Sequence, residues 1–195
     1  MKTYYHARAA EYDEWWLGEG RFADRVRPGW GDERAELTRL IAGLPSRRTL
    51  DVACGTGFLT RHLRGEVVGL DQSEAMLDVA REQAPNVTFV QGDALALPFD
   101  DDSFERVFTT YFYCHLEEPE RQRFLSEARR VAPELIVLGS IRRGDEQPAR
   151  WEERILNDGS TWTVYKRVFE PGALAGELGG GEVLHEGRWF VVVRA

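Results

Sequence analysis

Short apolar runs alternate with amphipathic stretches through most of the chain, and this pattern predicts strands and helices in turn. Apolar residues at helical spacing predict a helix over residues 33–44. Five strands are predicted at residues 48–54, 66–71, 87–90, 107–112 and 135–138. Ser73 and Pro119 are typical of helix starts, and Gly65 is expected to end a short helix that follows the first strand. Strands that alternate with helices usually pair in parallel, so we expect a doubly wound α/β sheet with helices on both faces.

The pattern changes after residue 140. Residues 151–156 predict a helix, residues 162–169 alternate as a strand does, and residues 172–178 are compatible with another short helix. The last apolar segments predict two strands joined by a turn at Glu186 and Gly187. We therefore expect a mostly parallel, seven-stranded sheet that ends in an antiparallel C-terminal hairpin.

The size and composition are those of a single globular domain. The chain has 195 residues, of which 43% are hydrophobic, and this is enough for one core. No repeat or long linker divides it. We expect one domain over residues 1–195, with an aromatic N-terminal helical lid at 1–45, a cofactor-binding core at 46–140 and a substrate-side connection and hairpin at 141–195.

The charge and the cysteines narrow the function classes. A net charge of −8 argues against nucleic acid or an anionic membrane as the main partner, because both favour a basic surface. No segment approaches the roughly 18 apolar residues of a membrane span, and the N-terminus does not resemble a leader peptide. Cys54 and Cys114 lie far apart and lack metal-ligand spacing, so neither a metal site nor a disulfide is indicated. A reducing, cytoplasmic location is expected.

The candidate chemistry begins at a glycine-rich turn after the first predicted strand. The segment T-L-D-V-A-C-G-T-G places Asp51 in the strand and Gly55 and Gly57 in the turn. Glycine has no Cβ and accepts positive φ, so backbone N–H groups there can approach a ligand closely. Asp71 ends the next strand, where a doubly wound fold commonly binds ribose hydroxyls, although it is also placed to cap the following helix. These residues predict a site for a nucleotide-containing cofactor.

Four segments in succession resemble the motifs of the class I S-adenosylmethionine-dependent methyltransferases, especially their small-molecule branch. They are L-D-V-A-C-G-T-G, G-L-D-Q-S-E-A-M-L, Q-G-D-A-L-A-L-P-F and S-F-E-R-V-F-T-T-Y-F-Y-C-H-L, within residues 50–140. The resemblance implies a Rossmann-like methyltransferase fold with S-adenosylmethionine as the cofactor and S-adenosylhomocysteine as its product. It also implies in-line transfer of a methyl group to a small-molecule acceptor.

The resemblance assigns most cofactor contacts to the ends of the predicted strands. The residues it implies are Tyr12, Asp51, Ala53, Gly55, Gly57, Asp71, Gln72, Met76, Asp93, Ala94, Leu95 and Thr109. Asp51 and the glycine turn would hold the amino acid part of the cofactor, Asp71 the ribose, and Asp93 with the next two residues the adenine edge. Ala53 departs from the family pattern, which often has glycine there. Met76 also fits an ordinary core position.

Substrate contacts are expected beyond the fourth strand. Tyr111 would face the substrate, and Arg142 could pair with an acidic group on it. His115 is the candidate catalytic base because histidine titrates near neutral pH, and packing is the alternative role. Displacement from a charged sulfur does not always require a base. The sequence lacks the N/D-P-P-Y/F element that relatives acting on bases and amides use, which again argues against nucleic acid.

Two other function classes remain open at this point. A nicotinamide-dependent oxidoreductase would need a third glycine, whereas Phe58, Leu59 and Thr60 follow Gly57, and it gives Asp93 no role. A non-catalytic subunit with the same fold is compatible with every motif. The sequence does not indicate the acceptor, the methylated atom or the oligomeric state.

Overall fold

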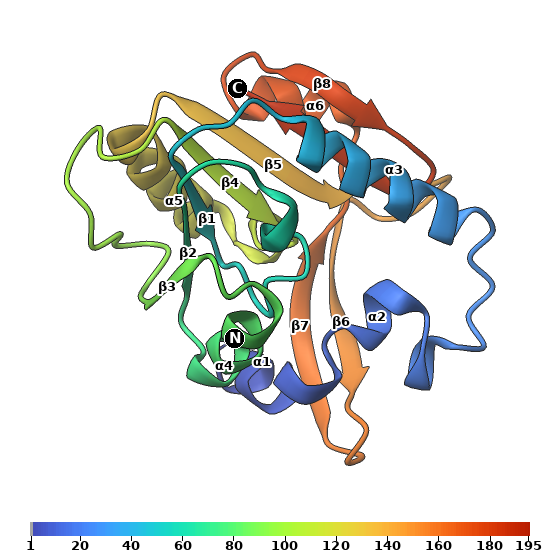
Figure 1. Cartoon of the computed structure of the whole chain (residues 1–195). Coiled ribbons are helices and arrows are strands. Elements are labelled where there is room, and N and C mark those ends of the chain that lie inside the picture. Colours follow the sequence, from blue (N-terminus) through green and yellow to red (C-terminus); the bar gives the residue numbers. More distant parts are fainter. Residues whose placement is uncertain (1) are drawn as a thin grey trace.

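The computed structural model describes residues 2–195 and arranges them around a seven-stranded sheet in the order β3-β2-β1-β4-β5-β9-β8 (Figure 1). The strands of this sheet are β1 (Thr49–Val52), β2 (Val67–Asp71), β3 (Thr88–Gln91), β4 (Arg106–Thr110), β5 (Glu134–Ser140), β8 (Glu182–Glu186) and β9 (Phe190–Arg194). β1 to β5 pair in parallel, while β9 runs antiparallel to both β5 and β8. The predicted sheet and its C-terminal hairpin are confirmed.

Helices cover both faces of this sheet. Figure 1 shows α3 in front of the sheet and α5 and α6 behind it. The helices are α1 (Lys2–Arg8), α2 (Glu14–Leu17), α3 (Trp30–Gly43), α4 (Glu74–Gln83), α5 (Glu118–Val131) and α6 (Pro171–Glu177), with 3-10 turns η1 (Ala9–Glu11), η2 (Gly20–Phe22), η3 (Thr60–His62) and η4 (Tyr113–His115). The predicted doubly wound arrangement is therefore confirmed. No helix in residues 2–195 has the length and apolar character that crossing a membrane requires.

Local sequence explains where these elements begin. Every residue of β1 is buried, as expected for a central parallel strand covered on both faces. Ser73 accepts a hydrogen bond from the backbone N–H of Met76 and so caps α4, as predicted. Glu117 and Glu120 form a capping box at the start of α5, where Pro119 lies in the first turn. These caps orient the helices that follow the strand ends.

Two predicted helices differ from the structure. The short helix expected after the first strand is only the 3-10 turn η3. The helix expected at residues 151–156 is wrong, because all but the last of these residues lie in β6 (Ala149–Ile155), which pairs with β7 (Thr161–Arg167) in a separate antiparallel hairpin. Alternate residues of β6, namely Arg150, Glu152 and Arg154, are half-buried while their neighbours are exposed. The strand's inner face is charged, so the usual apolar alternation is missing.

The β6–β7 hairpin stands off the sheet and lies beside the N-terminal helices (Figure 1). Arg21 donates to the backbone carbonyl of Leu156 at 3.1 Å, and Glu11 accepts from the backbone N–H of Asn157 at 2.7 Å. The side chain of Asn157 also donates to Glu14 at 3.0 Å. Residues 11–21 and the hairpin tip therefore support one another at the carboxyl end of the sheet.

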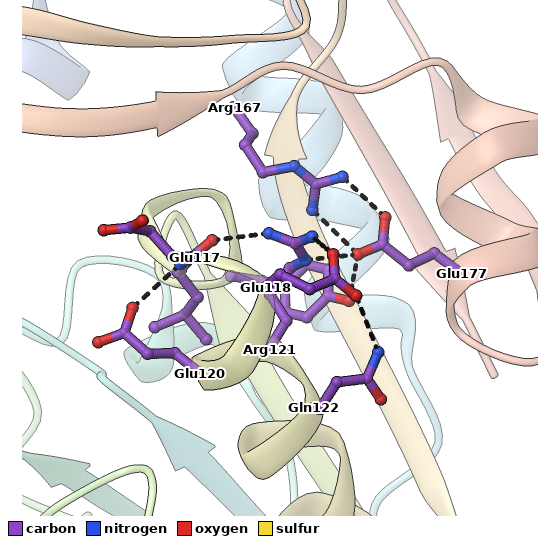
Figure 2. Close-up of polar contacts among 9 residues, drawn as sticks. Glu117, Glu118, Glu120, Arg121, Gln122, Arg167 and Glu177 are labelled. Carbon is purple, nitrogen blue, oxygen red and sulfur yellow. Dashed lines mark hydrogen bonds and ion pairs between the residues drawn. The ribbon is translucent and has the colours of Figure 1, made fainter.

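A half-buried carboxylate joins the base of the hairpin to the main fold (Figure 2). Glu177 of α6 accepts two hydrogen bonds of 2.9 Å from Arg167 of β7 and one of 2.7 Å from Tyr113 of η4. Arg121 of α5 lies 2.9 Å from the same carboxylate and donates to the backbone carbonyl of Leu116. One side chain therefore joins α5, α6, β7 and η4.

Replacing Glu177 with glutamine should lower the free energy of unfolding by about 2 kcal/mol, because two arginines lose a charged partner at a partly buried site. Chemical denaturation measures this change. The matched control is Glu170→Gln, which alters an exposed carboxylate 3.7 Å from Arg142 and should cost less than about 0.5 kcal/mol. Equal losses in both variants would contradict the anchoring role of Glu177.

Candidate functional site

The strand order reverses between β1 and β4, and a cavity of about 330 Å³ opens at the carboxyl ends of these strands. It is lined by Tyr5, Tyr12, Ala53, Gly55, Leu70, Asp71, Gln72, Met76, Gly92, Asp93, Ala94, Leu95, Thr110, Tyr111, Phe112, His115, Leu116 and Glu120. Apolar side chains form much of the wall, and several polar groups converge on it. This mixture is typical of a site for a small ligand.

The turn after β1 forms the floor of the cavity. Its backbone has positive φ at Ala53 (57°), Gly55 (57°) and Gly57 (74°). Only glycine adopts this conformation without strain, so Ala53 costs on the order of 1 kcal/mol. A Cβ on Gly57 would lie 3.3 Å from the Cβ of Ala80, so this glycine allows α4 to pack closely against the turn. The turn thus exposes backbone to the cavity.

Asp71 joins the turn to the next strand. Its carboxylate accepts hydrogen bonds from the backbone N–H of Gly55 at 3.0 Å and from that of Ser73 at 2.8 Å. Burial raises the pKa of Asp71, although these two N–H groups oppose the shift. The carboxylate lines the cavity while it holds the turn in place.

Asp51 lies behind the same turn and is almost fully buried. Thr60 donates a hydrogen bond of 2.6 Å to Oδ2, while Oδ1 has no partner. Burial raises the pKa of Asp51 to about 7, the Thr60 bond lowers it, and the charge of Asp71 raises it. A buried carboxylate with a free oxygen is suited to a cationic or N–H-bearing ligand group.

Another part of the cavity wall combines buried apolar side chains with the carboxylate of Asp93. Leu70 and Met76 are buried there. Asp93 accepts a hydrogen bond of 2.9 Å from the backbone N–H of Leu95, which orders the loop after β3. An apolar wall with a hydrogen-bond acceptor at its edge suits an aromatic base that carries an exocyclic amine.

The N-terminal segment closes over the turn. A Cβ on Gly55 would lie 3.6 Å from the ring of Tyr12, so the ring covers this glycine. The next residue, Asp13, accepts a hydrogen bond of 2.6 Å from Thr56 and another from Gln83 of α4. Burial also raises the pKa of Tyr12. The segment is thereby bound directly to the glycine turn.

Tyr111 ends β4 in a strained conformation, with φ of 53°. A bulky residue at positive φ is a backbone outlier, and such strain often accompanies a functional site. Its side chain is about nine-tenths buried and its hydroxyl has no hydrogen-bond partner. Tyr111 lines the cavity together with Thr110, whereas Thr109 turns away and donates to the backbone carbonyl of Val52 at 2.8 Å.

His115 lies at the rim near Tyr5, with their ring centroids 6.0 Å apart. Its Nδ1 is 2.6 Å from the carbonyl oxygen of Tyr165, which only accepts, so Nδ1 carries the proton and Nε2 of the neutral ring is an acceptor. Burial lowers the pKa of His115 to about 3, although the Tyr165 bond opposes this. The ring can accept a hydrogen bond at neutral pH but is a weak base.

A family model described as "Methyltransferase domain" matches residues 49–134. The demethylmenaquinone methyltransferase of Renibacterium salmoninarum is 38% identical over 94 residues, which are 47% of this chain and 39% of that protein. The enzyme of the same name from Thermotoga maritima is 35% identical over 103 residues, 50% of this chain and 44% of that protein. The chain thus matches less than half the length of these curated relatives.

Two solved structures resemble almost the whole chain. One, described as "DhpI-SAM-HEP complex", has a TM-score of 0.77 and 26% identity and covers 98% of this chain and 94% of that chain. The other, described as "DhpI-SAH complex structure", has a TM-score of 0.73 and 28% identity and covers 98% of this chain and 92% of that chain. These matches support the predicted resemblance to the class I S-adenosylmethionine-dependent methyltransferases, and the domain model covers somewhat less than half of this chain.

The cavity fits S-adenosylmethionine, the cofactor of the family that the chain resembles, in chemical terms. Oδ1 of Asp51 has no hydrogen-bond partner within residues 2–195, and such a carboxylate oxygen suits the amino group that the amino acid part of the cofactor carries. Gly55 and the carboxylate of Asp71, which both line the cavity, suit the ribose side, and the wall that includes Leu70, Met76 and Asp93 suits adenine. Within residues 2–195, no cluster of three or more His, Cys, Asp or Glu side chains could hold a metal ion.

The predicted site residues fall into three groups. Most line the cavity, namely Tyr12, Ala53, Gly55, Asp71, Gln72, Met76, Asp93, Ala94, Leu95, Tyr111 and His115. Asp51, Gly57 and Thr109 lie behind its walls. Arg142 lies outside it, where it donates to the backbone carbonyl of Glu146 at 2.8 Å.

Sequence reasoning missed other residues that line the cavity: Tyr5, Leu70, Gly92, Thr110, Phe112, Leu116 and Glu120. Leu70, Gly92, Thr110 and Phe112 are next to predicted site residues, so a wider window at each strand end would have included them. The density of aromatic residues before residue 31 was the only sign of Tyr5.

The raised pKa of Asp51 should make the ligand-free protein less stable as the pH rises. Between about pH 4.5 and 6.5 the unfolded state has lost this proton while the folded state keeps it, so stability falls by about 1 kcal/mol per pH unit. Denaturation curves of wild type and Asp51→Asn, recorded across this pH range, measure the effect as the difference between their free energies of unfolding. Parallel pH dependence in the two proteins would rule out a raised pKa at Asp51.

His115 should stay neutral between about pH 5 and 8, since its pKa is well below that range. Nitrogen NMR of histidine-labelled protein should show one signal set with Nδ1 protonated and no titration. A His115→Asn variant identifies the signals among those of the four histidines. A midpoint near pH 6 would contradict the buried environment described for this ring.

Proposed function

We propose that this protein binds S-adenosylmethionine in the 330 Å³ cavity and transfers its methyl group to a small-molecule acceptor. The observation that carries the proposal is the convergence of the β1 turn, the Asp71 carboxylate and the Asp93 loop on one cavity. The similarity to structures described with SAM and SAH over nearly the whole chain supports it.

The proposed roles of the residues follow from their positions. Asp71 would accept the ribose hydroxyls while Gly55 lets the ligand approach the backbone. Asp51 would compensate positive charge on the amino acid part through its free oxygen. When bound, S-adenosylmethionine supplies a methyl group on a positively charged sulfur. Tyr12 would cover the turn and exclude water, which favours transfer to the acceptor.

Alignment of the acceptor is the main catalytic contribution that we propose. Holding two reactants in line can supply about 7–11 kcal/mol, and the charged leaving group needs no activation. Tyr111 is placed between the cofactor cavity and the space under the hairpin, so it would contact both partners. His115 would position the acceptor by a hydrogen bond to Nε2 rather than remove its proton.

The relatives do not identify the acceptor. The family match covers residues 49–134 and ends before the β6–β7 hairpin. The demethylmenaquinone methyltransferases are similar over less than half of their length, and this supports the cofactor rather than their quinone substrate. We therefore propose a small acceptor that enters between the N-terminal helices and the hairpin.

Asp71→Ala should weaken the binding of S-adenosylhomocysteine at least about tenfold, because the variant loses a buried charged acceptor in the cavity. Isothermal titration calorimetry of the purified protein measures the affinity. Wild type is expected to bind in the micromolar range, which corresponds to a binding free energy of about −8 kcal/mol. NADH should not bind, since the turn lacks the third glycine of a nicotinamide site.

Two controls accompany this titration. Asp78→Ala removes an exposed carboxylate on α4 that pairs only with Arg81 and should leave the affinity unchanged. Asp93→Ala changes an exposed cavity residue and tests the site if Asp71→Ala does not fold. Failure of wild type to bind S-adenosylhomocysteine would refute the proposed function. Turnover with an acceptor would exclude a non-catalytic subunit.

A further inference from the structure

The inner face of the β6–β7 hairpin carries charged side chains next to the proposed methyl-transfer site. Arg150 and Lys166 are paired across the two strands, as are Glu152 and Val164, so these residues share one face. Arg154 lies on the same face of β6. Inward-facing charges are costly to stability, so their position here needs a functional explanation.

A second cavity of about 150 Å³ lies under this face and is strongly basic. Six cationic side chains line it, namely Arg25, Arg27, Arg143, Arg150, Arg154 and Lys166, against two carboxylates, Glu146 and Glu152. Glu152 lies 2.6 Å from Arg150 and also pairs with Arg154, and Glu146 lies 3.2 Å from Arg143. These eight side chains carry a formal net charge of +4, although the net charge of the whole chain is −8.

Three of these cations have no carboxylate partner among the residues that the structure describes: Arg25, Arg27 and Lys166. Arg27 donates only to the backbone carbonyl of Trp15, at 2.9 Å. Burial lowers the pKa of all three, and neighbouring cations lower it further. The cluster therefore has unused positive charge that a bound anion would neutralise.

A smaller cavity of about 40 Å³ connects the basic cluster to the cofactor cavity. It shares Tyr5, Tyr12, Tyr111 and His115 with the cofactor cavity, and Trp15, Tyr111, Arg154 and Lys166 with the basic one. Arg8 also lines it, and none of its lining residues is Asp or Glu. Tyr111 borders all three cavities.

We propose that the methyl acceptor is a small acid whose oxyanion group, a carboxylate or a phosphate-type group, is held by Lys166, Arg154 and Arg8 beneath the hairpin. The acceptor's reacting end would then reach Tyr111 at the cofactor cavity. This inference rests on the proposed function, because it takes the neighbouring cavity to hold the methyl donor. Arginine and lysine donors match oxyanions in both charge and hydrogen-bond geometry.

The test is anion binding by calorimetry at low ionic strength, with inorganic phosphate and acetate as probes in separate arms. Wild type should bind at least one probe saturably. Lys166→Met should weaken that binding at least about tenfold, because an uncharged side chain of similar volume replaces a half-buried cation that has no carboxylate partner within residues 2–195. Lys166→Arg should retain binding within about threefold. The matched control is Arg123→Met, which alters an exposed arginine on α5 and should change nothing.

A stability measurement separates a binding role from a structural one. Without added anion, Lys166→Met should be at least as stable as wild type, because a desolvated charge without a carboxylate partner is removed. Should Lys166→Met fail to fold, Arg25→Gln changes an exposed position that also lines the basic cavity and should weaken anion binding about threefold.

The outcomes distinguish this inference from the proposed function. Wild type that binds S-adenosylhomocysteine but neither anion would overturn the acid-acceptor proposal and leave the methyltransferase proposal intact. Unchanged anion binding in both Lys166→Met and Arg25→Gln would also overturn it. Wild type that binds no S-adenosylhomocysteine would refute the proposed function itself.

Discussion

The carboxylate of Asp71 is the contact on which the candidate site depends most. One of its oxygens holds the backbone N–H of Gly55 and the other holds that of Ser73, so one side chain connects the β1 turn with the start of α4. That connection keeps the strained backbone at Ala53 in place. The same carboxylate lines the cavity. A ligand that binds to Asp71 therefore contacts the side chain that holds the β1 turn in place.

The contacts of Asp71 serve both stability and the site. The charged inner face of the β6–β7 hairpin, in contrast, costs stability and is explained by function. A hairpin that only covered the sheet would be more stable with apolar residues on its inner face. Here Glu177 anchors the hairpin from its base, through Arg167 and Tyr113, and the N-terminal helices support its tip. With both ends held by neighbouring elements, the middle of the hairpin can carry the cations that border the basic cavity.

Much of the sheet and the cofactor cavity could be predicted from the sequence because their signals are local. The turn around Gly55 and Gly57 and the acids Asp71 and Asp93 each follow an apolar strand within a few residues. Of the two hairpin strands, β7 matches the alternation predicted at residues 162–169, whereas β6 could not be predicted, because Arg150, Glu152 and Arg154 replace the apolar residues that normally reveal a strand's inner face. Arg142 was expected near the substrate for its charge, but the cations that line the cavities come from residues that only tertiary contacts bring together.

The uncharged groups around the connecting cavity are poor proton acceptors near neutral pH. Burial raises the pKa values of Tyr5, Tyr12 and Tyr111, so these hydroxyls stay protonated. Burial also lowers the pKa of His115 to about 3, and its ring stays neutral. Such surroundings favour an acceptor whose reacting atom already has a free lone pair, since no proton must then be removed during transfer. The oxyanion that the cations beneath the hairpin would hold lies at the other end of the acceptor, so it fixes the acceptor's position while the reacting atom must supply its own lone pair.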